Sequence, residues 1–96
     1  MLTWKRTLRT TSSERFLARH EGRDTAAVDL HYLANGTVAG TVILLKDAGW
    51  NESDVPSLLG SLDEDFLPDV DLDRGNLNYT VVIGEVLGNY EALQNP

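Results

Sequence analysis

Three aspartates that alternate along residues 69 to 75, DVDLDRG, raise the question of calcium binding. An EF-hand loop has acids at positions 1, 3 and 5, glycine at position 6 and a bidentate glutamate at position 12. If Asp69 is position 1, Asp71 and Asp73 fit, but position 6 is Arg74 and position 12 is Thr80. The sequence therefore does not predict an EF-hand. Two interpretations stay open: a non-standard divalent metal site at the three aspartates, or a strand whose aspartates face solvent.

Asp29 and His31 are the residues whose spacing could serve acid–base chemistry. Two residues apart in a strand, they would share one face of a sheet, where a carboxylate can orient an imidazole. A serine hydrolase would also need an activated nucleophile, and the chain has no G-x-S-x-G motif. We therefore predict no catalytic residue and no cofactor. The alternative is a small-ligand-binding or enzymatic domain that uses the face of Asp29 and His31, with Tyr32 nearby.

The N-terminal region is basic in an otherwise acidic chain. The net charge is −7, yet residues 1 to 23 contain six of the eight cations and two of the fifteen acids. We define a candidate basic patch by its five residues Lys5, Arg6, Arg9, Arg15 and Arg19. Cations interleaved with Trp4 and Phe16 would suit stacking on nucleic-acid bases, whereas the net charge repels phosphate at long range. Nucleic-acid binding is therefore kept as a further alternative only, as is divalent-metal binding.

An acidic run, Asp63 to Asp65, falls in the last turn of a predicted helix. That end of a helix carries partial negative charge, so acids there are unfavourable unless cations lie nearby. We therefore expect an arginine of the basic patch to approach this run, within the fold or across a dimer.

Hydrophobic patterning predicts the elements that would position these side chains. Strand-like runs bounded by turn residues are residues 2–9, 15–21, 26–34, 37–46 and 77–88. Residues 51–68 have the apolar spacing of a helix, with Ser53 as N-cap, Pro56 in the first turn and Pro68 at the end. The order β-β-β-β-α-β indicates an α+β fold: an antiparallel sheet of four to five strands with one amphipathic helix on one face. We expect a single domain over residues 1–88 and a loosely ordered tail over residues 89–96.

The same periodicities predict a core between the helix and one face of the sheet. The expected core residues are Val28, Leu30, Tyr32, Ile43, Val55, Leu58, Leu59, Leu62, Phe66, Tyr79, Val81 and Ile83.

The dipeptide Asn35-Gly36 lies between two β-rich runs and predicts a two-residue hairpin loop of type I′. That loop would place Tyr32 opposite Ala39 and would leave four aliphatic residues on the sheet face away from the helix. These four residues are Leu33, Val38, Val42 and Leu44. An apolar face of this kind is unusual for a monomer, so we expect it to bind a partner, with a second copy of the chain as the default. Asp29 and His31 would lie at its rim. A sheet that curls enough to bury these residues itself is the alternative.

The chain is short, with 96 residues and no cysteine, which excludes a disulfide-stabilised scaffold. Its longest nearly apolar run, residues 38–45, is too short to span a bilayer, and no signal peptide is visible, so we expect a soluble, cytoplasmic protein that does not bind membranes. Because no catalytic motif is present, a non-enzymatic protein-interaction module, with a protein partner or as a homodimer, is the first hypothesis for function.

Overall fold

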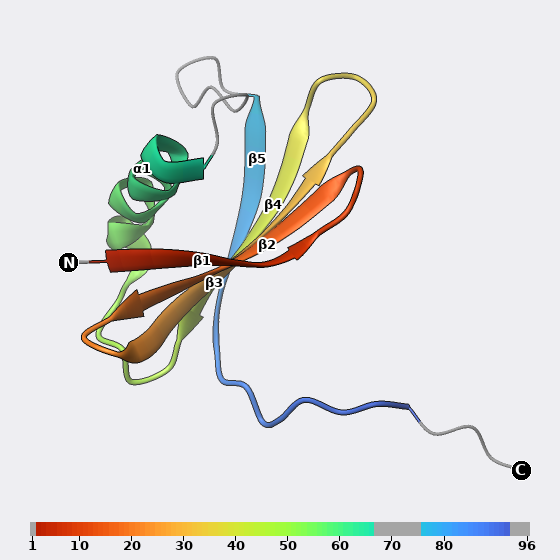
Figure 1. Cartoon of the computed structure of the whole chain (residues 1–96). Coiled ribbons are helices and arrows are strands. Elements are labelled where there is room, and N and C mark those ends of the chain that lie inside the picture. Colours follow the sequence, from red (N-terminus) through yellow and green to blue (C-terminus); the bar gives the residue numbers. More distant parts are fainter. Residues whose placement is uncertain (1, 67–75, 93–96) are drawn as a thin grey trace, which may run out of the picture.

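A computed structural model describes residues 2–66 and 76–92 of the chain, with the side chains of Asp65 and Phe66 left out. The elements are β1 (Leu2–Arg9), β2 (Ser13–His20), β3 (Arg23–Tyr32), β4 (Val38–Leu45), the short 3-10 helix η1 (Glu52–Asp54), α1 (Val55–Phe66) and β5 (Leu77–Gly84). Figure 1 shows this order along the chain. The predicted α+β class and the predicted order of strands and helix are confirmed.

The five strands form one sheet in sequence order, β1 to β5. The first three pairs are antiparallel, but β5 runs parallel to β4. The expectation of a purely antiparallel sheet is therefore wrong. The reason is the connection: η1 and α1 carry the chain back to the end of the sheet where β4 began, and a strand that starts there must run parallel to β4.

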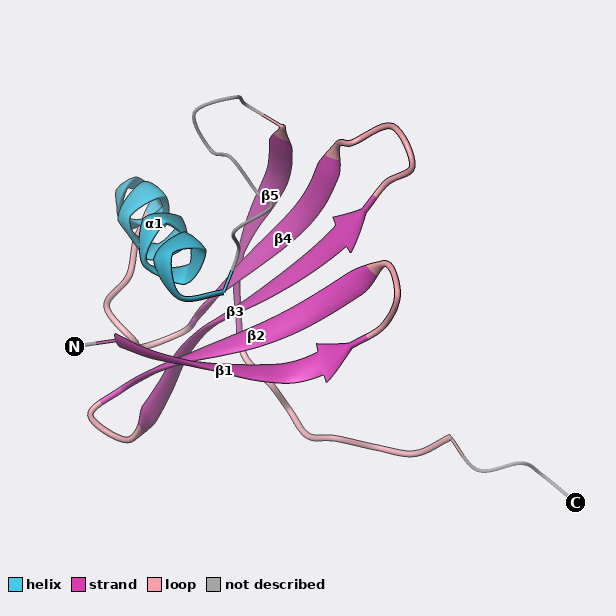
Figure 2. Ribbon diagram, turned by 45° about the horizontal axis from the view of Figure 1, so that its top comes forward, coloured by secondary structure: helices cyan, strands magenta, loops and turns pink. Residues whose placement is uncertain are grey.

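Helix α1 packs on one face of the sheet, as Figure 2 shows, and the core lies between them. The helix begins after a capping box in which Asn51 Oδ1 accepts from Ser53 N (3.0 Å) and Asn51 N donates to Asp54 Oδ2 (2.9 Å). The N-cap is therefore Asn51 and not Ser53. At the β1 edge of the sheet, Trp4 Nε1 donates a hydrogen bond to Ser61 Oγ of α1 (3.1 Å), which links the helix to this strand.

The turn between β3 and β4 has three residues, 34–36, between Leu33 and Thr37, and not two. Leu33 N donates to Thr37 O (2.9 Å) and Gly36 N donates to Leu33 O (3.1 Å). Gly36 adopts a φ of +87°, while Asn35 keeps a negative φ, which a type I′ turn does not allow. Asn-Gly also suits this loop, a turn closed by a left-handed glycine, and the extra residue shifts the strand register by one position.

Because the register shifts by one residue, the side chains of β4 that were expected on the outer face of the sheet lie on the helix side. Tyr32 lies opposite Val38 and Val28 lies opposite Val42. As a result Val38, Val42 and Leu44 are buried in the core, whereas Leu33 is 48% exposed beside the turn. The apolar outer face expected from these four residues does not form. Ile43, expected in the core, faces the other side of the sheet and is partly exposed.

The core is otherwise built largely from the expected residues, with additions from the first two strands. Its buried members are Trp4, Phe16, Ala18, Ala26, Val28, Leu30, Val38, Val42, Leu44, Val55, Leu58, Leu59 and Leu62. Tyr32 and Val81 pack against this cluster. No helix in the described parts of the chain is long and apolar enough to cross a membrane.

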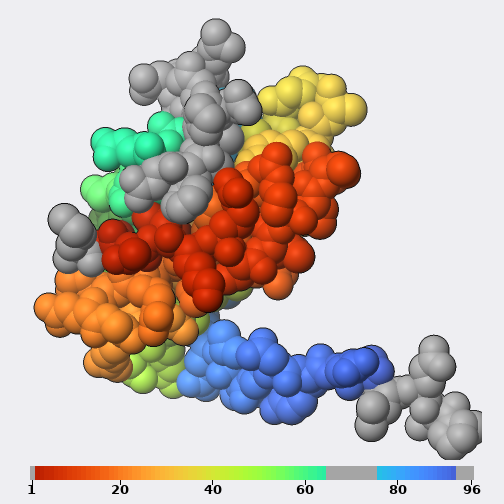
Figure 3. All heavy atoms as spheres, viewed as in Figure 1, coloured from red at the N-terminus to blue at the C-terminus, as the bar shows by residue number. Residues whose placement is uncertain are grey.

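Strand β5 is only half covered, although Tyr79 and Ile83 were expected in the core. Tyr79 is 42% exposed and Ile83 is 64% exposed. Beyond Gly84, residues 85–92 leave the sheet without regular structure, and Figure 3 shows them running away from the body of the protein.

Candidate functional site

Among the residues whose burial the structure describes, the most buried charged one is Glu14, at the start of β2, which is 2% exposed. Its carboxylate contacts Arg6 Nε of β1 at 3.0 Å and also contacts the Arg9 guanidinium. The hydroxyl of Tyr32, from the end of β3, donates a hydrogen bond to Glu14. These four residues, which we call the Glu14 cluster, tie one end of β1, β2 and β3 together.

The Tyr32 hydroxyl is held in its neutral form. Burial raises the pKa of the Tyr32 phenol above its ordinary value of 10.0, and the hydrogen bond to Glu14 and the Glu14 charge raise it further. Tyr32 therefore acts as a hydrogen-bond donor at neutral pH. Because the carboxylate is buried and surrounded by three partners, the arrangement stabilises the sheet and leaves no room for a substrate to reach Glu14.

Replacing Tyr32 with phenylalanine is expected to cost about 1.5–3 kcal/mol of stability, because the hydrogen bond has a charged acceptor. A raised pKa in the folded state also makes wild-type stability fall as pH rises above about 10, where the unfolded phenol ionises first. The phenylalanine variant has no phenol at this position, so its free energy of unfolding should fall less steeply with pH than that of the wild type. The difference should show between about pH 9 and 11, roughly one pH unit on either side of the ordinary tyrosine pKa. Urea unfolding across that range measures both effects, and equal slopes for the two proteins would contradict the assignment.

Asp29 and His31 lie on the sheet face opposite α1, since Val28 and Leu30, which alternate with them along β3, point into the core. The Asp29 carboxylate accepts from Arg15 Nε at 2.7 Å, across the β2–β3 pair. His31 is exposed at the next position on the same face. Asp29 is therefore engaged by an arginine, and no contact in the described residues joins it to His31.

The basic patch is divided among several ion pairs. Arg6 and Arg9 contact Glu14, Arg15 contacts Asp29, and Arg19 Nε lies 3.0 Å from Asp24 Oδ1. Lys5 is exposed on β1. In the contacts found among the described residues, the carboxylates that pair with these arginines belong to the sheet; the acidic run also includes Asp65, whose side chain lies outside the described part.

The proposed metal ligands Asp69, Asp71 and Asp73 lie outside the described residues. Within residues 2–66 and 76–92, no three histidine, aspartate or glutamate side chains gather closely enough to hold a metal ion.

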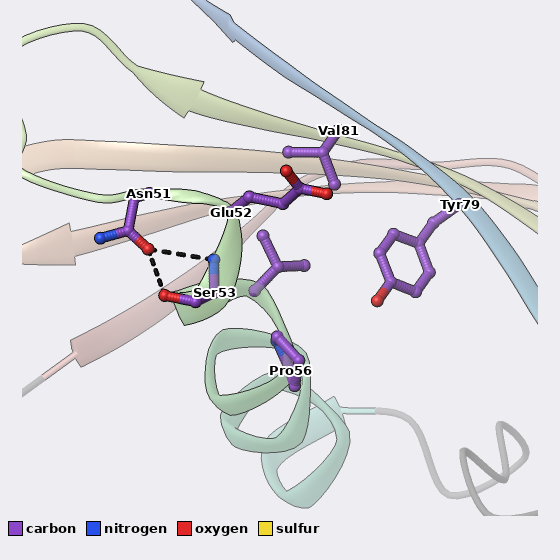
Figure 4. Close-up of a pocket in the computed structure, with 7 residues that line it drawn as sticks. Asn51, Glu52, Ser53, Pro56, Tyr79 and Val81 are labelled. Carbon is purple, nitrogen blue, oxygen red and sulfur yellow. Dashed lines mark hydrogen bonds between the residues drawn. The ribbon is translucent and has the colours of Figure 1, made fainter.

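A groove runs along the helix side of β5, between this strand and the start of α1. Its largest hollow, about 580 Å³, is lined by apolar Val55, Pro56 and Val81, by Tyr79, and by Asn51, Glu52 and Ser53 of the helix start (Figure 4). Adjoining hollows extend it to Leu77 at one end of β5 and to Ile83 at the other. Tyr79 lines all three hollows. We call this feature the β5 groove. Helix α1 contacts β1, at the opposite edge of the sheet, where Trp4 Nε1 donates to Ser61 Oγ.

The outer edge of β5 carries backbone groups with no partner strand among the described residues. Asn76 O accepts from Val38 N (2.8 Å) and Gly84 O accepts from Lys46 N (2.7 Å). Backbone groups of successive strand residues point to opposite sides, so the even-numbered residues of β5 face β4. The N–H and C=O groups of the odd-numbered residues, 77 to 83, therefore point outward.

The two edges of the sheet differ in chemistry. Strand β1 carries Lys5, Arg6 and Arg9 and has a register irregularity between Arg6 and Leu8. Charges and bulges of this kind prevent an edge from pairing with other strands. Strand β5, LNYTVVIG, has neither a charge nor a proline in eight residues. As far as the described residues go, the edge beside the groove is therefore open to pairing, and the other is protected.

Sequence reasoning assigned β5 to the core and missed the groove. The uncharged run LNYTVVIG is a signal of strand pairing, but its place at an edge follows from the parallel pairing with β4. Polar groups around the groove come from Asn51, Glu52, Ser53 and Tyr79, a set better suited to holding a ligand than to bond breaking.

Comparison of the chain with protein-family models, with curated proteins and with solved structures finds no match.

Proposed function

We propose that this protein is a non-enzymatic protein-interaction module that binds an extended segment of a partner protein along the outer edge of β5. The observation that carries the proposal is an uncharged eight-residue edge strand beside an open apolar groove. Addition of a strand to a sheet edge is a recurrent way of binding peptides, in which backbone hydrogen bonds supply affinity and pockets for alternate side chains supply specificity. We place this activity in the cytoplasm.

Backbone pairing is available at four positions of β5, the odd-numbered residues 77 to 83. The side chains of these residues point to the helix side, where they line the β5 groove. Alternate side chains of an added strand would lie on that same side and would extend the apolar surface of the groove. One binding event would thus use both the edge and the groove.

Exposed apolar side chains favour the same location. Tyr79 and Ile83 are large, exposed and on the groove side of β5. Covering them would remove apolar surface from water, which contributes about 25 cal/mol per Å² before the costs of association. The enzymatic alternative based on Asp29 and His31 has less support, because Arg15 already engages the Asp29 carboxylate.

Replacing Ile83 with proline tests this proposal. Ile83 points its N–H outward, so proline removes a donor from the free edge and leaves the β4–β5 pairing intact. The matched control is Ile83→Ala, which also loses the exposed side chain but keeps the N–H. Peptides selected from a random displayed library on the wild-type protein should bind the proline variant about tenfold more weakly than the alanine variant.

Amide hydrogen exchange supplies a second readout for the same peptides. Bound peptide should slow exchange at residues 77, 79, 81 and 83, whereas the amides that already face β4 should change little. Equal binding by the proline and alanine variants, or protection located on β1, would contradict strand addition at β5.

A further inference from the structure

Among the described residues, Glu52 is the only charged one that lines the hollows of the β5 groove. Residues 47–96 contain eleven of the fifteen acids and one of the eight cations, Arg74. Within the described part of this half there is no lysine or arginine. Glu52 lines both of the larger hollows of the groove. The groove therefore presents a carboxylate beside its apolar surface, and no lysine or arginine is among the described residues that line it; Lys46 lies at the end of β4, where its N–H bonds to Gly84 O.

Glu52 and Tyr79 approach the largest hollow from opposite sides. Figure 4 shows Glu52 extending from η1 toward β5, and Tyr79 extending from β5 toward the helix. Pro56 and Val81 line the same hollow and supply apolar surface. The site thus combines an apolar surface, an aromatic ring and a carboxylate.

From this arrangement we infer that the partner segment carries a lysine or arginine, flanked by apolar or β-branched residues, whose side chain enters this hollow. The inference rests on the proposed function and names the chemistry of its partner. The aliphatic part of a lysine or arginine packs on apolar surface while its charged end stays near solvent. A cation beside a tyrosine ring is attracted by the ring, and Glu52 lies in the same hollow to pair with the charge.

A second copy of the chain does not supply this chemistry from the region that would reach the groove. Strand β5 is uncharged, the segment that follows it contains Glu85 and Glu91 and no cation, and in the sequence before it Arg74 is outnumbered by Asp69, Asp71 and Asp73. Pairing of the β5 edges of two copies would bring the acids of one copy close to those of the other. In the N-terminal half, Arg6, Arg9, Arg15 and Arg19 already contact acids of their own sheet. The complementary occupant is a basic segment of a different protein.

Capped nine-residue peptides of alternating threonine and valine, with one central variable residue, test this inference. The central residue is lysine, arginine, norleucine or glutamate, and binding to the full-length protein is measured by fluorescence anisotropy and NMR titration. Lysine and arginine peptides should bind about tenfold more tightly than the norleucine peptide, as expected from one ion pair and one cation–π contact together. The glutamate peptide should bind most weakly.

Glu52→Gln should weaken binding of the lysine peptide about tenfold and so abolish its preference over norleucine. The matched control is Glu64→Gln, an exposed acid at the other end of α1, which should keep the preference. Glu52 is exposed, and its side chain is not part of the capping box, so the variant is expected to fold.

The outcomes separate the two proposals. Equal binding of lysine and norleucine peptides, with weaker binding by Ile83→Pro, would overturn the basic-partner inference and leave strand addition standing. Absence of binding by every peptide, or binding that Ile83→Pro does not weaken, would overturn both. A wild-type dimer on a sizing column with light scattering that Ile83→Pro converts to a monomer would identify a second copy as the occupant and overturn the basic-partner inference.

Discussion

Replacing Leu62 with alanine is expected to lower the free energy of unfolding by about 2–5 kcal/mol. Leu62 is fully buried where α1 meets the sheet, so the change leaves a cavity among neighbours that can collapse only in part. Domains of this size have total stabilities of about 5–15 kcal/mol, so the loss is a large fraction of the whole. Urea unfolding followed by tryptophan fluorescence and circular dichroism measures it.

The matched control for Leu62 is Leu87→Ala. Leu87 is 86% exposed in the segment after β5, and its truncation should change stability by less than about 0.5 kcal/mol. A Leu62 variant as stable as the Leu87 variant would show that α1 does not cover the sheet as described.

Replacing Glu14 with glutamine is expected to cost about 3 kcal/mol, the second largest effect. The amide keeps the shape of the side chain but removes the negative charge that faces Arg6, Arg9 and the Tyr32 hydroxyl. The effect lies at the lower end of the range for buried pairs because the two arginines are themselves partly exposed and can turn toward water.

Asp29→Asn is the control for Glu14→Gln, since it makes the same chemical change in a pair with Arg15 on the outer face. That pair is much more exposed than Glu14, with 54% of the Arg15 side chain and 28% of the Asp29 side chain open to solvent, so its loss should cost less than about 1 kcal/mol. Thermal and urea unfolding of both variants at neutral pH make the comparison. Similar losses would mean that burial does not distinguish the two carboxylates.

Local sequence patterns were enough to predict the strands, the helix and their order. Leu58, Leu59 and Leu62 recur at helical spacing, and only a helix places them on one face, so this assignment depends on the chain alone. Alternation likewise shows which residues of one strand share a face. These features are local because they follow from the geometry of a single element.

Relations between elements required the tertiary structure. Asn35-Gly36 is compatible with a two-residue and a three-residue loop, and the difference of one residue decides whether Val38 and Val42 face the helix or the opposite side. Likewise, LNYTVVIG reads as a core strand in either direction, and only its parallel pairing beside β4 leaves Tyr79 and Ile83 exposed at an edge.

The candidate site could not be predicted from the sequence, because it also depends on contacts between elements that are distant along the chain. Glu52 of η1 and Tyr79 of β5 line one hollow of the β5 groove, and their proximity depends on how η1 and α1 pack on the sheet. Glu14 is buried because three strands bring two arginines and a tyrosine to it. The sequence by itself determined which side chains share a face of each element. Pairing and packing between distant segments decided which face was covered, which edge stayed free and which charges met.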